Sequence, residues 1–145
     1  MEMLLTVSII GMLAAVLVPT FNLAMRSRQN AECANKLRMA AEAFELYAAD
    51  KGGYPPSSQP GVIPPLMADY YFPYFKIDWW GAAAELGGSW TWNIDQDGVH
   101  AAVSINAPTA LQPQMEDFDR LVDDGNLTTG RFRKVGTKYN FIIEN

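Results

Sequence analysis

The chain starts with a single carboxylate, Glu2, followed by an uncharged and mostly apolar run from Met3 to Met25. Because a helix rises about 1.5 Å per residue, such a run extends over about 35 Å, close to the hydrocarbon thickness of a bilayer. The core of one small domain rarely needs an apolar helix of that length. The sequence therefore predicts that residues 1–25 contact lipid or an equally apolar environment.

A cleaved secretory signal peptide is the main alternative for this segment. The apolar part of a signal peptide is about 7–15 residues long and follows positively charged residues. Here the side-chain charge ahead of the apolar run is the carboxylate of Glu2, and the run is longer. We therefore interpret residues 1–25 as a membrane-spanning segment.

The remaining residues, roughly 120, are enough for one globular head. Their composition restricts the functions that this head can have. The net charge of -5 argues against a dedicated nucleic-acid surface, because phosphate binding needs clustered Lys and Arg. The lone Cys33 excludes an intrachain disulfide, and the lone His100 leaves few options for metal or acid–base chemistry. The sequence has no Ser-His-Asp set, metal-spaced His or Cys cluster, or phosphate-binding glycine loop, so we expect no enzymatic activity and no cofactor.

The apolar run continues into an amphipathic helix. Apolar positions recur there at spacings of three and four residues, namely Cys33, Leu37, Ala40, Phe44 and Tyr47. Two glycines and two prolines then stop the helix near Asp50. A helix from Glu2 to Asp50 would be about 74 Å long, which exceeds a head of this size, so its first half must project. We expect residues 26–50 to belong to the head, which spans 26–145.

The second half of the chain contains strand signals. Residues 89–94 and 99–105 flank an Asp-Gln-Asp-Gly turn, which is typical of a β-hairpin. Residues 108–124 contain a helical face of Met115, Phe118, Leu121 and Val122, and residues 131–135 and 138–143 are two further predicted strands. The predicted fold class is α+β: a long N-terminal helix whose second half packs on a small, mostly antiparallel β-sheet. The pattern leaves the strand order open.

An aromatic tract lies between the helix and the hairpin. It contains Tyr70, Tyr71, Phe72, Tyr74, Phe75, Trp79 and Trp80. Such a tract can line a ligand groove, but aromatic side chains also bury much area in a head that lacks a disulfide. We therefore assign the tract to the head core and to a subunit interface, with no ligand-binding role.

The segment EMLLTVSIIGMLAAVLVP, residues 2–19, resembles the N-terminus of type IV pilins and of the pseudopilins of type II secretion. Members of that superfamily have a Glu at the head of the apolar run, a Gly nine residues later and a Pro eight residues after the Gly. Glu2, Gly11 and Pro19 match all three. The segment YAADKGGYPP, residues 47–56, is similar to the end of the long helix in major pseudopilins.

Two departures from the superfamily pattern accompany this resemblance. Family members begin with a short basic leader and usually a Phe a few residues before the Glu, so the resemblance implies that these residues precede Met1. Many pilins also close a C-terminal loop with a disulfide, which the lone Cys33 rules out.

The resemblance implies roles for three residues. Glu2 would pair with the N-terminal amine of a neighbouring subunit during filament assembly; the alternative is a helix-start acid that lies among lipid headgroups. Gly11 and Pro19 would let the helix unwind between them, and the alternative is a plain kink with a small-residue packing contact.

The resemblance also implies partners and location. The partners would be copies of the same chain in a helical filament, the prepilin peptidase, and the pilus or secretion assembly machinery. The subunit would cross the bacterial inner membrane once before assembly and later belong to an extracellular or periplasmic filament. Arg26 and Arg28 follow the span and taken alone would favour a cytoplasmic head, but the basic leader that the resemblance implies would supply the opposing charge.

The expected function is that of a structural subunit of a filament of the type IV pilus family. One alternative is a major pseudopilin of a type II secretion system, whose periplasmic pseudopilus helps to export proteins. A more distant alternative is a monomeric, membrane-anchored binding module.

Two Asp-rich turns, residues 95–98 and 123–126, offer oxygen ligands of the kind that Ca²⁺ accepts. Some major pseudopilins bind calcium near their C-terminal loop, which favours Asp123, Asp124 and Asn126. Neither turn has the full ligand spacing of a known loop, so ordinary turn chemistry is the preferred explanation and calcium the alternative. The triplet that begins at Asn126 also fits the acceptor pattern for N-glycosylation, which alone is weak evidence in a bacterial protein.

Overall fold

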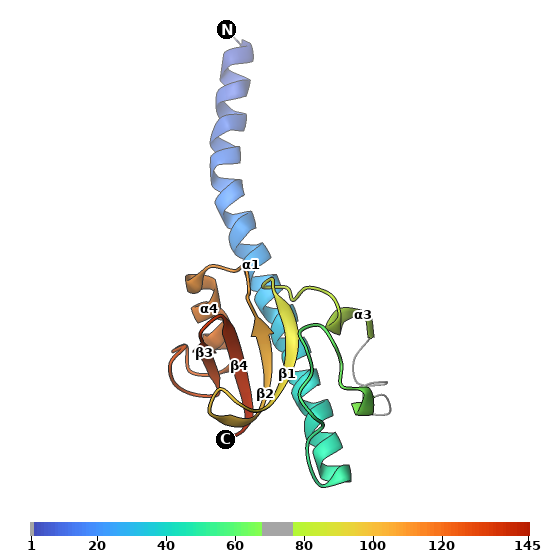
Figure 1. The fold of residues 1–145 in the computed structure, drawn as a ribbon. Helices are drawn as coiled ribbons and strands as arrows, with labels where there is room; N and C mark the ends of the chain where they lie inside the picture. The colour runs from blue at the N-terminus through green and yellow to red at the C-terminus, as the bar shows by residue number, and fades with distance from the viewer. Residues whose placement is uncertain (1, 68–76) are drawn as a thin grey trace.

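The computed structural model describes residues 2–67 and 77–145, and it confirms the predicted α+β fold. The long helix α1 runs from Glu2 to Lys51 and projects far beyond the head (Figure 1). The later elements are η1 (Pro65–Met67), α3 (Ile77–Trp80), β1 (Ser89–Gln96), β2 (Val99–Asn106), α4 (Gln112–Val122), β3 (Phe132–Val135) and β4 (Lys138–Glu144).

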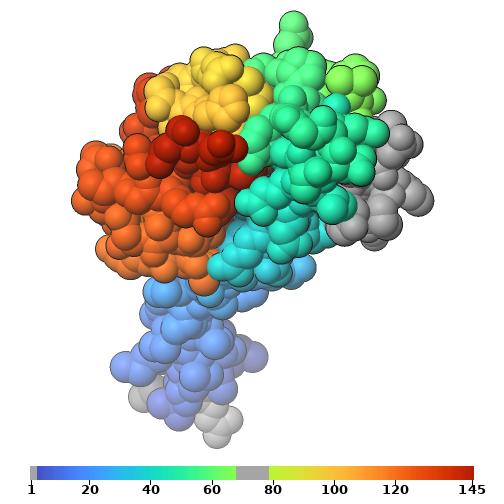
Figure 2. All heavy atoms as spheres, turned by 90° about the horizontal axis from the view of Figure 1, so that it is seen from below, coloured from blue at the N-terminus to red at the C-terminus, as the bar shows by residue number. Residues whose placement is uncertain are grey.

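The first half of α1 does not pack against the head. Every side chain from Met3 to Arg28 is exposed, and Asn30 is the first that is buried. In the space-filling view the same segment stands clear of the head as a stalk (Figure 2). Burial therefore begins a few residues beyond the boundary that the sequence placed between residues 25 and 26.

The helix is continuous through Gly11 and Pro19, where the sequence predicted a disturbance. Pro19 has no backbone N–H to donate to the carbonyl four residues earlier. The neighbouring Thr20 adds a donor, because its Oγ1 donates to the Leu17 carbonyl at 2.9 Å and to the Val16 carbonyl at 3.2 Å. The single subunit thus accommodates the proline within a regular helix, and unwinding on assembly stays a prediction.

The second half of α1 forms one wall of the head core. The five predicted apolar positions are all buried, and Leu37 and Phe44 have no exposed surface. At the edge of this face, Lys36 forms an ion pair with Glu32 at 3.7 Å and also pairs with Glu85 of the head. The 3.6-residue periodicity of the sequence therefore identified the buried face correctly.

The four strands form one antiparallel sheet in the order β1-β2-β4-β3. The predicted hairpin is confirmed: Trp92 pairs with Val103, and the turn uses positive φ at Asp95, Asp97 and Gly98. The free edge of β1 is covered by the Pro-rich connector, whose backbone N–H groups donate to strand carbonyls from residues 58 and 61 at 3.1 and 2.7 Å. This cover removes an edge that could pair with other chains.

Aromatic side chains fill the space between α1 and the sheet. Phe44 stacks on Trp92 with ring centroids 3.8 Å apart, and the indole Nε1 of Trp92 donates to the Pro55 carbonyl at 2.9 Å. Trp79 and Trp80 are buried in the same cluster, in agreement with their assignment to the core. The other aromatic residues of that tract, residues 70–75, lie outside the described residues.

Truncation of Phe44 to Ala should lower the free energy of unfolding of the head by about 3–5 kcal/mol, because a fully buried ring leaves a cavity. Leu46→Ala is the matched control on the same helix, since Leu46 is 40% exposed, and should change stability by less than about 1 kcal/mol. Urea unfolding of the detergent-solubilised chain, followed by tryptophan fluorescence, measures both. Equal losses in the two variants would contradict this core assignment.

Candidate functional site

In the part of the chain that the structure describes, the largest exposed apolar surface belongs to α1. Its large apolar side chains between Met3 and Met25 are from 41% to 83% exposed, with these two residues at the extremes. Among the described residues, α1 is the one helix long and apolar enough to cross a membrane. Soluble monomers rarely leave so large a contiguous apolar surface in water. This surface therefore requires lipid or protein around it.

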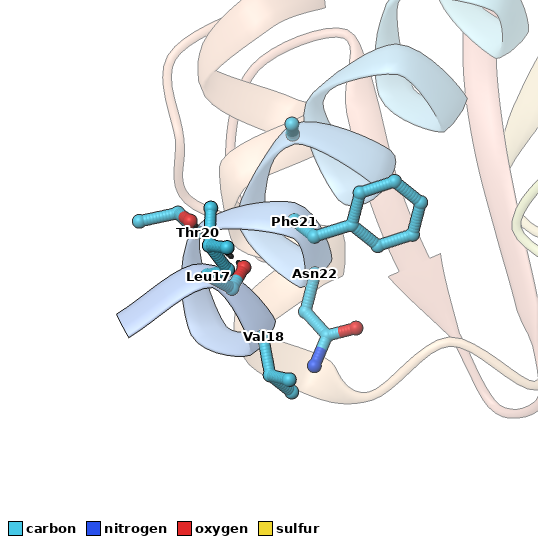
Figure 3. A pocket seen from close by; sticks show the side chains of 6 residues that line it. Leu17, Val18, Thr20, Phe21 and Asn22 are labelled. Carbon is cyan, nitrogen blue, oxygen red and sulfur yellow. Dashed lines mark hydrogen bonds between the residues drawn. The ribbon is translucent and has the colours of Figure 1, made fainter. Parts of the chain in front are cut away.

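A hollow of about 520 Å³ lies on this surface, lined by Leu17, Val18, Thr20, Phe21, Asn22 and Ala24 (Figure 3). All six residues come from α1 and all are exposed. No residue of another element is among the residues that line the hollow, so the hollow is a part of the surface of α1. Its shape suits a neighbouring apolar chain better than an enclosed small molecule.

The three residues expected to serve assembly lie along this helix. Glu2 is its first residue, and Gly11 and Pro19 lie within it. A Cβ atom at Gly11 would meet nothing within 4 Å. The fold of one subunit therefore places no steric demand for glycine at position 11, and any packing demand must come from another molecule.

The head contributes a second site, an acidic cluster at the end of α4 formed by Asp119, Asp123 and Asp124. One carboxylate oxygen from each lies within 4.8 Å of the others. Asp119 is completely buried, and neither of its oxygens makes a hydrogen bond of good geometry with the described residues, although the backbone N–H of Gly125 is near enough to lower its pKa. Charged side chains are seldom fully buried unless they are paired, and Asp119 departs from this rule.

The other two acids are held by the loop that follows. Asp123 Oδ2 accepts the backbone N–H groups of Arg131 and Phe132, the latter at 3.1 Å. Asp124 Oδ1 accepts the N–H of Asn126 at 2.8 Å, and its Oδ2 accepts the Thr129 hydroxyl at 2.7 Å. Turn chemistry therefore fixes both carboxylates, as expected, and it also brings them next to Asp119.

Asn126 does not join the three carboxylates. Its Oδ1 instead accepts the backbone N–H and the hydroxyl of Thr128, at 3.1 and 2.7 Å. Of the three predicted calcium ligands, the structure thus brings Asp123 and Asp124 together and replaces Asn126 by Asp119. The sequence held a signal for this, because Asp119 lies four residues after the buried Met115 and so on the apolar face of α4.

The electrostatics of the cluster favour a bound proton or a cation. Burial, followed by the negative charges of Asp124 and Asp123, raises the pKa of Asp119 to about 6. The hydrogen bonds from Thr129 and Asn126 lower the pKa of Asp124. A buried carboxylate with no well-formed hydrogen bond, beside two others, fits the oxygen-rich coordination of Ca²⁺. Asp119, Asp123 and Asp124 would hold such an ion and tie the end of α4 to the loop before β3.

The single histidine, His100, and the single cysteine, Cys33, do not belong to this acidic cluster. His100 is on β2, where its Nδ1 lies 2.6 Å from the exposed Asp95 carboxylate; this hydrogen bond raises the pKa of the imidazole. Cys33 is buried on α1, and burial raises the pKa of its thiol. A buried thiol with a raised pKa is a poor nucleophile.

The fold and the two sites define an α+β protein in which a long, exposed apolar N-terminal helix continues into a small antiparallel head. This architecture is compatible with that of pilin-like proteins. Comparisons with protein-family models, with curated proteins and with solved structures find no significant match.

Proposed function

We propose that the chain is the structural subunit of a helical filament of the type IV pilus family. Residues 1–25 hold the subunit in the bacterial inner membrane before assembly, and the same residues form the filament core afterwards. The observation that carries the proposal is the exposure of every side chain of α1 from Met3 to Arg28. The same helix then continues into a second half that is packed in the head.

Two features of α1 favour assembly over simple anchoring. A lipid anchor needs only length and apolarity, whereas this segment also has a carboxylate, Glu2, at its apolar end. Gly11 has no packing role inside the subunit, and small residues allow helices in apolar surroundings to approach closely. Both features have a use when identical helices pack together. The resemblance of residues 2–19 to pilins points the same way.

A major pseudopilin of type II secretion is the second candidate. The turn after the long helix, Gly53-Tyr54-Pro55, favours it. Tyr54 packs against Trp92 with ring centroids 5.5 Å apart, so this turn is tied to the head core. Both candidates share the same assembly, and they differ in fibre length and in the compartment that the fibre reaches.

Electron microscopy of the full chain, extracted from membranes and after assembly, tests the proposal. We expect ordered helical fibres in which α1 helices form the centre and heads lie outside. A chain that stays a solitary, lipid-bound monomer under conditions that assemble a reference pilin would overturn the proposal and favour the anchored binding module. Fibres confined to the periplasm would select the pseudopilus.

A further inference from the structure

The loop between α4 and β3 presents Asn126 on the surface of the head. Asn126 and Thr128 are exposed, whereas Leu127 between them is buried and 7% exposed. The Leu127 carbonyl accepts the backbone N–H of Lys134 at 2.8 Å, and the Asn126 carbonyl accepts that of Thr129 at 2.9 Å. The loop thus has a defined shape with Asn126 on its outside.

The side chain of Asn126 is held by its oxygen. Oδ1 accepts two hydrogen bonds from Thr128, one from the backbone N–H at 3.1 Å and one from the hydroxyl at 2.7 Å. No described residue hydrogen-bonds to Nδ2. The amide nitrogen is therefore open to a reactant from solvent while the amide oxygen is fixed.

This arrangement favours reaction at the nitrogen. An amide nitrogen is a weak nucleophile because its lone pair is delocalised onto the oxygen. When the nitrogen loses a proton as it forms a new bond, negative charge grows on Oδ1. Two donors aimed at that oxygen stabilise the charge, as the donors of an oxyanion hole do. The hydroxyl of Thr128 is one of these donors, which gives a physical reason for Thr two residues after Asn.

We propose that Asn126 is a site of N-linked glycosylation, an inference that depends on the proposed function because it needs a head outside the inner membrane. The sugar donor is a glycan linked to a polyprenyl diphosphate, and a membrane oligosaccharyltransferase catalyses the transfer. Nδ2 forms a bond to the anomeric carbon, and the bond from that carbon to the diphosphate oxygen breaks. The diphosphate leaves with the electron pair, and a base of the transferase takes the Nδ2 proton.

Mass spectrometry of the protein purified from the cells that make it tests the inference. Trypsin cuts after Arg120 and Arg131, so Asn126 lies in the peptide of residues 121–131. We expect this peptide to carry a glycan that is released by an amidase with conversion of Asn126 to aspartate. Asn126→Gln and Thr128→Val should both lose the glycan. Thr128→Ser keeps the hydroxyl and should keep it.

The outcomes separate the inference from the proposed function. Fibres whose 121–131 peptide has its unmodified mass would overturn glycosylation and leave the filament proposal intact. A head found in the cytoplasm would overturn the filament proposal itself. A glycan that persists in Asn126→Gln would place the modification on another residue and also overturn the inference. All three variants change exposed side chains, and circular dichroism checks that each retains the wild-type fold.

Discussion

Replacement of Glu2 by Ala is expected to abolish filament formation and to leave membrane insertion unchanged. In the proposed filament core, the Glu2 carboxylate pairs with an amine of a neighbouring subunit. Loss of one partner from a buried ion pair costs about 3–5 kcal/mol, because the other charge stays buried and unpaired. At about 1.4 kcal/mol for each factor of ten, each subunit contact weakens by a factor of about 140 to 4000. Insertion does not suffer, since Ala makes the segment more apolar.

The measurement separates assembly from insertion. Fibres are counted by electron microscopy and quantified by sedimentation, and insertion is measured as resistance to alkaline extraction from membranes. Thr6→Ala is the matched control, because it removes a polar group from the same helix without removing charge; it should assemble normally. Normal fibre yield from Glu2→Ala would mean that this carboxylate serves only as a helix-start acid at the lipid headgroups.

Local signals in the sequence were sufficient to predict α1, α4 and the four strands. The spacing of Leu37 and Phe44 defines a helical face, and the Asp-Gln-Asp-Gly turn between two apolar runs defines a hairpin, because each signal involves residues that are close in sequence. The order β1-β2-β4-β3 has no such signal. It depends on which edge of the first hairpin meets β4, and this is decided by packing between distant segments.

The acidic site was only half predictable. Asp123 and Asp124 lie in a turn with a clear composition, and their grouping followed from it. A charged side chain such as that of Asp119 is usually in water, yet the helix repeat places it beside Met115 and Phe118, where Phe118 packs on Phe132 at 5.1 Å. Conversely Leu121, predicted on the buried face, is 46% exposed. The docking of α4 decides between these positions, and residue type alone does not.

Because Asp119 is buried, we expect the free energy of unfolding of the head to depend on pH and on calcium. Its pKa is about 6 in the folded chain and 3.8 for the ordinary side chain. A raised pKa means that the protonated form is favoured by folding. The resulting stability is fully present below pH 3.8 and is lost as pH rises through about 6. In EDTA, we expect the free energy of unfolding to fall by about 1–3 kcal/mol from this group between pH 4 and pH 7.

Asp119→Asn should remove this loss, because an amide carries no charge to bury. At pH 7 in EDTA the variant should therefore be more stable than the wild type by a similar amount. Asp117→Asn is the matched control on the same helix, since the Asp117 side chain is 63% exposed and pairs with Arg120 at 2.5 Å. Its pH profile should follow that of the wild type. Identical profiles for Asp119→Asn and the wild type would show that water or a donor reaches the Asp119 oxygens.

Calcium should reverse the loss at neutral pH in the wild type, because a divalent cation stabilises the three carboxylates that repel one another in its absence. A ligand at 100 times its dissociation constant stabilises a folded chain by about 2.7 kcal/mol. Thermal unfolding at pH 7 should thus shift upward with Ca²⁺ for the wild type and for Asp117→Asn, and not for Asp119→Asn. An upward shift in all three would place the ion elsewhere. If Ca²⁺ changes the unfolding temperature of none of the three proteins, a proton and not Ca²⁺ neutralises the cluster. Loss of that proton from Asp119 would then destabilise the end of α4 as pH rises.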